Sequence, residues 1–108
     1  MYQIAFYNLS THDNEVTRTL LNRYAAYTDK KIQVTSFSSG YDLISTDSVY
    51  HIVIVDLTVD RENALIIAKS FLTHNTYSRL ILLSNTIDHY QDGFKIGAKR
   101  YFVKPLVA

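Results

Sequence analysis

The stretch His51-Ile52-Val53-Ile54-Val55-Asp56-Leu57 is the most apolar in the chain, and it is interrupted by a single charged side chain. A continuous run of β-branched residues such as 52–55 is typical of a strand that is buried on both faces. A carboxylate placed where such a strand gives way to a loop loses water and needs a partner. Asp56 is therefore the first candidate functional residue, either as a ligand for a cation or as a reacting group.

Apolar segments of two kinds alternate on both sides of this stretch. In the first kind, apolar residues recur at helical spacing, which predicts amphipathic or short helices over about 12–27, 41–44, about 64–72 and roughly 89–96. Short β-branched or aromatic runs predict five strands, at Tyr2–Tyr7, Ile32–Phe37, His51–Val55, Arg79–Ser84 and Arg100–Val103. Strand and helix alternate four times before the last strand, which predicts a parallel sheet between two helical layers.

Length, composition and charge limit the classes of function. The 108 residues, of which 47% are hydrophobic, predict one domain over 1–108. A net charge of +1 provides no basic surplus for a phosphate backbone, so direct nucleic-acid contact is not expected. The chain has no Cys, as suits a reducing cytoplasm, and no apolar run reaches the length of a membrane span.

Polar residues follow four of the five predicted strands. Asn8 comes after the first, Asp56 after the third, Ser84 at the end of the fourth and Lys104 after the fifth. Ligands and reacting groups gather at the carboxyl ends of strands in open parallel sheets. We therefore expect these four side chains to converge at one edge of the sheet.

In these features the whole chain resembles a receiver (CheY-like) domain of bacterial two-component response regulators. Asp56 matches the phosphoacceptor aspartate of that family, and Ser84 matches its switch hydroxyl. The segment 97–105, Gly-Ala-Lys-Arg-Tyr-Phe-Val-Lys-Pro, matches the fifth-strand signature, with Tyr101 as the switch aromatic and Lys104 as the family lysine. The resemblance implies a flavodoxin-like, doubly wound, three-layer sheet of five strands, and a regulatory domain rather than an enzyme.

A softer similarity concerns the segment 37–44, Phe-Ser-Ser-Gly-Tyr-Asp-Leu-Ile, which is similar to receivers that precede LytTR-type DNA-binding domains. It implies control of an attached output domain in transcription regulation, with a histidine kinase as a possible partner. Receivers of this kind commonly dimerise through the fourth helix, fifth strand and fifth helix. The fifth helix expected after Lys104 is missing from this sequence, which stops at Ala108; a homodimer or swapped assembly would cover the apolar surface that this exposes.

The departures from the family concern the cation site. Asn8 and Leu9 stand where the family has two adjacent acids, while Asp60 and Ala64 replace a proline and a glycine in the loop after the phosphoacceptor. The remaining candidate Mg²⁺ ligands are the Asp56 carboxylate, the Thr58 main-chain carbonyl and the Asn8 amide oxygen. Each lost carboxylate removes up to ~4 kcal/mol of attraction at an effective dielectric near 20. We expect weak Mg²⁺ binding or none, no other cofactor, and a direct pair between Asp56 and Lys104.

Other interpretations remain open. A conventional receiver would be phosphorylated on Asp56 by a histidine kinase, with self-phosphorylation and dephosphorylation as its only chemistry. A small flavodoxin-like or nucleotide-binding enzyme is disfavoured, because none of the three Gly residues follows the first strand. Asp13 is read as an acid at the start of a helix, Asp60 as a solvated loop acid, and Tyr101 as a packing aromatic. Ser84 is either a switch hydroxyl or a strand-end hydroxyl bonded to backbone.

Overall fold

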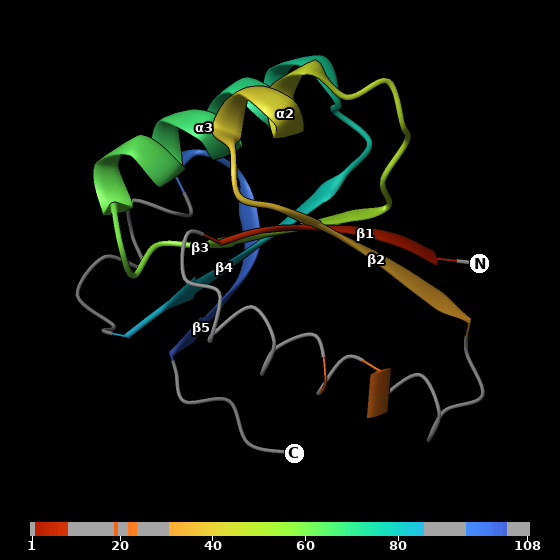
Figure 1. The fold of residues 1–108 in the computed structure, drawn as a ribbon. Coiled ribbons are helices and arrows are strands. Elements are labelled where there is room, and N and C mark those ends of the chain that lie inside the picture. Colours follow the sequence, from red (N-terminus) through yellow and green to blue (C-terminus); the bar gives the residue numbers. More distant parts are fainter. Residues whose placement is uncertain (1, 9–18, 20–21, 24–30, 86–94, 104–108) are drawn as a thin grey trace.

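Five parallel strands form one sheet in the computed structural model, which describes residues 2–8, 19, 22–23, 31–85 and 95–103 (Figure 1). The strands lie in the order β2-β1-β3-β4-β5. The chain adds β2 on one side of β1 and then crosses to the other side, where it adds β3, β4 and β5 in turn. This order is that of a flavodoxin-like doubly wound sheet, and it confirms the predicted fold class. The strands are β1 (Tyr2–Tyr7), β2 (Ile32–Phe37), β3 (Ile52–Asp56), β4 (Arg79–Ser84) and β5 (Ala98–Val103).

Two described helices, α2 (Gly40–Ser45) and α3 (Arg61–His74), cover the same face of the sheet (Figure 1). Each is capped by a side chain from the residue before it: Ser39 Oγ accepts from Asp42 N at 3.3 Å, and Asp60 Oδ1 accepts from Asn63 N at 3.2 Å. Such caps satisfy amide groups that have no partner within the helix. The predicted helix over 89–96 lies almost wholly outside the described residues, and only positions 19, 22 and 23 of the one over 12–27 are described, all three helical.

The boundaries differ from the sequence prediction at two strands. Asp56 is the last residue of β3 rather than the first of a loop, and its neighbour across the sheet is Leu83 of β4. β5 begins at Ala98, two residues earlier than the apolar pattern indicated. The register between β4 and β5 shifts between Leu80 and Ile81, which is a bulge. Exposed cationic residues at the start of β5 hid this part of the strand from a pattern based on apolar residues.

Both faces of the sheet are buried, as the continuous apolar strands predicted. The face under α2 and α3 carries the larger cluster, whose fully buried members include Val53, Val55 and Phe71. On the opposite face a second cluster gathers Ile4, Phe6, Val34, Ile54 and Leu83. Alternate residues of β1, β3 and β4 therefore enter different clusters, as the two-residue period of a strand requires.

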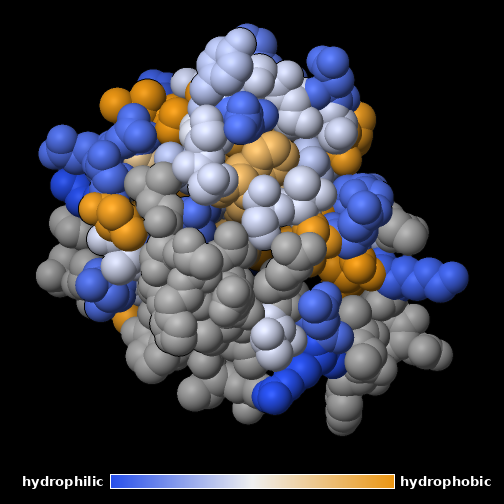
Figure 2. All heavy atoms as spheres, viewed as in Figure 1, coloured by the Kyte–Doolittle hydropathy of each residue, from blue (hydrophilic) through white to orange (hydrophobic). Residues whose placement is uncertain are grey.

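The close approach of α2 and α3 depends on a glycine. A Cβ on Gly40 would lie 2.4 Å from Ile67 Cδ1 and 2.8 Å from Ile67 Cγ1, so any larger residue would have to displace that side chain. The outer surface is mixed, and Figure 2 shows small apolar groups scattered between hydrophilic ones over the described residues of that face. Among the described residues no helix is both long and apolar enough for a membrane span.

Candidate functional site

Asp56 lies at the carboxyl edge of the sheet with only 5% of its surface exposed. Its two carboxylate oxygens accept hydrogen bonds from different donors: Oδ1 from the main-chain N of Thr58 at 2.8 Å, and Oδ2 from Nδ2 of Asn8 at 3.3 Å. A buried carboxylate is tolerated when donors replace the lost water. In the described part of the chain, two neutral N–H groups therefore replace some of the water that the Asp56 carboxylate has lost.

Asn8 joins the ends of three strands. Its main-chain N donates to Phe37 O of β2 at 3.1 Å, its own chain position directly follows β1, and its amide reaches Asp56 of β3. The side chain is 2% exposed. The sequence named the amide oxygen of Asn8 as a candidate ligand in a site where we expect weak Mg²⁺ binding or none. In the structure the amide nitrogen faces Asp56 Oδ2, because only a donor can satisfy the carboxylate.

Thr58 contributes more than the sequence indicated. Its main-chain N–H donates to Asp56 Oδ1, whereas the sequence indicated a role only for its main-chain carbonyl. The Thr58 hydroxyl is buried and has no hydrogen-bond partner among the residues that the structure describes. Such an orphaned hydroxyl costs free energy, on the order of 1–3 kcal/mol. No sequence signal identifies it, because a threonine in a loop after a strand is ordinarily solvated.

Ser84 and Tyr101 stand on the two strands beyond Asp56. Ser84 ends β4 with 2% exposure, and it lies opposite Val103, the last described residue of β5. Tyr101 is partly buried against the core cluster under α2 and α3, and it lies opposite Leu82. The structure therefore brings Asn8, Asp56 and Ser84 to one edge. Lys104 and Asp13 lie outside the described residues, and so does the expected pair between Lys104 and Asp56.

Tyr7 is a buried titratable group that no sequence pattern singled out. It occupies the last position of β1, next to Asn8, with 2% of its surface exposed. Burial raises the pKa of the Tyr7 phenol above its ordinary value of 10.0, and the negative charge of Asp60 raises it further. Both causes penalise the phenolate, so the phenol stays neutral at this edge at physiological pH.

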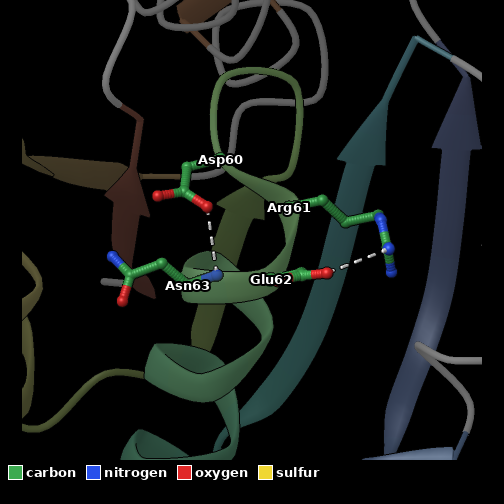
Figure 3. A network of polar contacts seen from close by, with 4 residues as sticks. All are labelled: Asp60, Arg61, Glu62 and Asn63. Atoms are coloured by element: carbon green, nitrogen blue, oxygen red, sulfur yellow. Dashed lines mark hydrogen bonds and ion pairs between the residues drawn. The ribbon is translucent and has the colours of Figure 1, made fainter.

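Figure 3 shows the polar contacts at the start of α3, the helix that follows the loop after Asp56. Asp60, read from the sequence as a solvated loop acid, accepts the main-chain N–H of Asn63 and is the N-cap of the helix. Arg61 and Glu62 form a loose ion pair, with 4.0 Å between Arg61 Nη2 and Glu62 Oε1 on an exposed surface. Exposed pairs of this kind contribute little. The acid that replaces the family proline thus has a local structural role.

The described donor set does not suit a divalent cation. Mg²⁺ requires oxygen ligands in a near-octahedral arrangement. Here the side chain next to the carboxylate presents an N–H, and both carboxylate oxygens already accept hydrogen bonds. Across the ranges 2–8, 31–85 and 95–103, no three His, Cys, Asp or Glu side chains cluster closely enough to hold a metal ion.

Among known proteins, solved structures resemble this chain and identify its fold. No family model matches the sequence, and no curated protein resembles it significantly. Among solved structures, the response regulator TrrA of Thermotoga maritima in complex with Mg²⁺ and BeF has a TM-score of 0.80 at 18% identity, with 98% of this chain and 89% of that chain covered. CheY4 of Vibrio cholerae has a TM-score of 0.78 at 17% identity, with coverage of 99% and 89%.

A longer solved structure is matched over only part of its length. The response regulator DrrB of Thermotoga maritima, an OmpR/PhoB homologue, has a TM-score of 0.77 at 21% identity over 98% of this chain. The present chain spans only 46% of DrrB, but 87% of the DrrB receiver domain solved by itself with BeF3. The structural neighbours of this chain are receiver domains, and its fold is that of a response regulator receiver.

Proposed function

We propose that residues 1–108 form a regulatory receiver domain that is degenerate at its cation site and works without Mg²⁺. It would control an attached output domain, of the DNA-binding kind, through protein contact or dimerisation. The observation that carries the proposal is the hydrogen bond from Asn8 Nδ2 to Asp56 Oδ2. Asn8 stands at the position of the first acid of the family motif, so a neutral donor faces Asp56 where the family has a second carboxylate.

The chemistry of phosphoryl transfer explains why that one bond matters. A carboxylate can accept a phosphoryl group only if the charge on the transferred oxygens is neutralised, for which receivers use a divalent cation and a lysine. Exchanging a carboxylate for an amide removes one full negative charge. The bond from Asn8 must also be broken before a cation could reach Oδ2, which adds the loss of a buried, charge-assisted hydrogen bond.

Lys104 is proposed as the cation that balances Asp56. Val103 lies opposite Ser84, so the chain reaches the carboxyl edge of the sheet one residue before Lys104. One ammonium and one carboxylate would leave the pocket near neutral, with no net negative charge to attract a dication. In such a pocket, removing either member would leave the other uncompensated, at about 3–5 kcal/mol if both are well buried.

A conventional phosphoacceptor domain is the second candidate. It is favoured by the position of Asp56 at the end of the central strand β3, with Ser84 buried at the end of the adjacent strand β4. In that case a histidine kinase would phosphorylate Asp56, and the only catalytic activity would be self-phosphorylation and dephosphorylation. Both candidates imply a cytoplasmic signalling protein.

Phosphorylation by a small donor separates the two candidates. The chain and its Asp56→Asn variant would be incubated with acetyl phosphate and Mg²⁺, and their intact masses measured. A degenerate site gives no stoichiometric adduct on either protein. An adduct of one phosphoryl group on the parent chain that is absent from Asp56→Asn would establish the conventional function instead.

A gain-of-function variant tests the reason for the degeneracy. Replacing Asn8 and Leu9 together by Asp restores the charge of the family motif while Asp56 is untouched. We expect saturable Mg²⁺ binding in this variant, measured as chemical-shift changes at Thr58 during a Mg²⁺ titration. The parent chain should show no saturable change at Thr58. Equal Mg²⁺ affinity in the two proteins would show that Asn8 does not set the cation preference.

A further inference from the structure

The edge of the sheet opposite Asp56 contains a hydrogen bond from the main chain to a histidine ring. His51 stands just before β3 and is exposed. Its main-chain N donates to Gln3 O at 2.9 Å, as a parallel ladder requires. The Gln3 main-chain N donates in turn to the imidazole Nδ1 of His51, at 3.0 Å.

In this arrangement the ring takes the place of a peptide carbonyl. The regular pairing of β1 with β3 begins at Ile4 and Ile52, so the amide of Gln3 lies one residue before it. An imidazole nitrogen can accept a hydrogen bond only while it carries a lone pair. The contact therefore requires a neutral ring with its proton on Nε2. The Tyr2 ring meets the His51 ring edge-on, with centroids 5.5 Å apart at 74°, which helps to orient the imidazole.

The contact belongs to a chain of hydrogen bonds that crosses four strands. Gln3 Nε2 donates to Gln33 Oε1 of β2 at 3.1 Å, and Arg79 N of β4 donates to His51 O at 3.0 Å. At the amino ends of the flanking strands the described titratable or charged residues are Tyr2 of β1, Arg79 of β4 and Lys31 before β2, with Asp47 and Tyr50 in the segment before β3. Unlike these side chains, an imidazole ordinarily changes its charge between pH 5 and 8.

We propose that His51 is a proton-sensitive latch that holds the start of β1 against β3. In its neutral form the ring completes the pairing of Gln3. When the ring binds a second proton, Nδ1 becomes a donor, so two N–H groups face each other and the contact is lost. The Gln3 amide then loses its acceptor next to β3, while the main-chain bond from His51 N to Gln3 O remains. This device does not depend on phosphorylation or on the chemistry of Asp56.

Ring NMR on the intact protein tests the chemistry directly. With ¹⁵N-labelled histidine at pH 8, we expect the His51 ring to show the tautomer that is protonated at Nε2, with Nδ1 shifted as a hydrogen-bond acceptor. A ring protonated at Nδ1 at this pH would overturn the proposal, because that nitrogen could not accept from Gln3.

Amide hydrogen exchange tests the consequence. Between pH 8 and pH 5 we expect the protection factor of the Gln3 amide, which is corrected for intrinsic exchange, to fall about two- to tenfold, as for the loss of one hydrogen bond. The Leu57 amide, which donates to Leu83 O at 2.8 Å at the other edge, should keep its protection. Equal protection of Gln3 at both pH values would overturn the latch.

Two histidine variants assign the effect. His51→Asn places an amide oxygen near the position of Nδ1 but does not titrate, so the pH dependence of Gln3 protection should disappear. His74→Asn alters another exposed histidine, whose ring contacts Ser70 O on α3, and should leave that dependence unchanged. A dependence that persists in His51→Asn, or disappears in His74→Asn, would refute the assignment. The ring spectra of the parent chain decide the matter if His51→Asn does not fold.

Discussion

The pairing of β1 with β3 is continued at both ends by hydrogen bonds that involve side chains, but the two ends differ in their environment. At the carboxyl edge the Asn8 amide binds the Asp56 carboxylate, and both residues are at most 5% exposed. At the amino edge the Gln3 main chain binds the His51 ring in contact with solvent. The strand pairing between them, from Ile4 with Ile52 to Tyr7 with Val55, is regular.

This difference indicates what each bond does. Water can replace the partner of an exposed donor, so the amino-edge contact can open and close at small cost. A carboxylate that loses its donor in a buried site has no such replacement, and the cost is greater for a charged group than for a neutral one. The amino edge is therefore suited to reversible change, whereas the carboxyl edge holds a fixed arrangement around Asp56.

The largest expected effect on stability comes from removing the buried hydrogen bond between Asn8 and Asp56. Asn8→Leu removes the donor to Asp56 Oδ2, and we expect the free energy of unfolding to fall by about 2–3 kcal/mol in urea denaturation. The matched change at the other edge, His51→Leu, should cost less than about 1 kcal/mol because water reaches Gln3. In an Asp56→Leu background, Asn8→Leu should cost clearly less. Equal losses from the two single variants would remove the distinction between the edges.

The two glycines near the edges give the next effect. At Gly40 the limit is space, so Gly40→Ala should cost about 1–3 kcal/mol, and Ile67→Ala should recover part of that loss in the double variant. At Gly97 the limit is the backbone, whose φ is 99° while Leu72 Cδ1 would be 3.7 Å from an added Cβ. We expect Gly97→Ala to cost about 1 kcal/mol and Leu72→Ala to give no recovery. Thermal unfolding of the four single variants and of the two double variants distinguishes the limit of space from the limit of backbone conformation.

A smaller effect is expected at the rim of the carboxyl edge. Asp60→Ala removes the cap of α3 and should destabilise the protein by about 1 kcal/mol in denaturant unfolding. Asp60→Asn keeps an oxygen for the Asn63 amide and should cost much less. It also removes the charge that helps to raise the pKa of Tyr7, so that pKa should move down in Asp60→Asn. An unchanged Tyr7 titration in this variant would leave burial as the only cause.

The smallest effect concerns the two tyrosines at the ends of β1. Tyr7 is 2% exposed and Tyr2 is 49% exposed. Because the folded state raises the pKa of Tyr7, the corresponding stability is complete below about pH 10 and is lost as the pH rises through the folded value. Tyr7→Phe should therefore weaken the alkaline loss of stability, and Tyr2→Phe provides the matched control at the exposed end of β1. Unfolding curves between pH 8 and pH 11 provide the measurement.

Much of this fold follows from local patterns. The run 52–55 is β-branched throughout, and such a run reads as a buried strand in any chain. Alternation with helical segments then restricts the topology to a parallel sheet, and the strand ends name Asn8, Asp56 and Ser84 as neighbours. The start of β5 was missed, because Lys99 and Arg100 are exposed and a bulge breaks the pattern there.

The sequence by itself determined the sheet, its likeness to a receiver, and the loss of the two acids beside Asp56. Only the tertiary structure decided how Asp56 is satisfied, because the donors come from Asn8, 48 residues away, and from the turn at Thr58. The same holds for the contact between Gln3 and His51, for the burial of Tyr7 and for the space at Gly40. The physical reason is that hydrophobic periodicity is a property of neighbours in the chain, whereas hydrogen-bond partners and steric limits arise between segments that meet only when the sheet has formed.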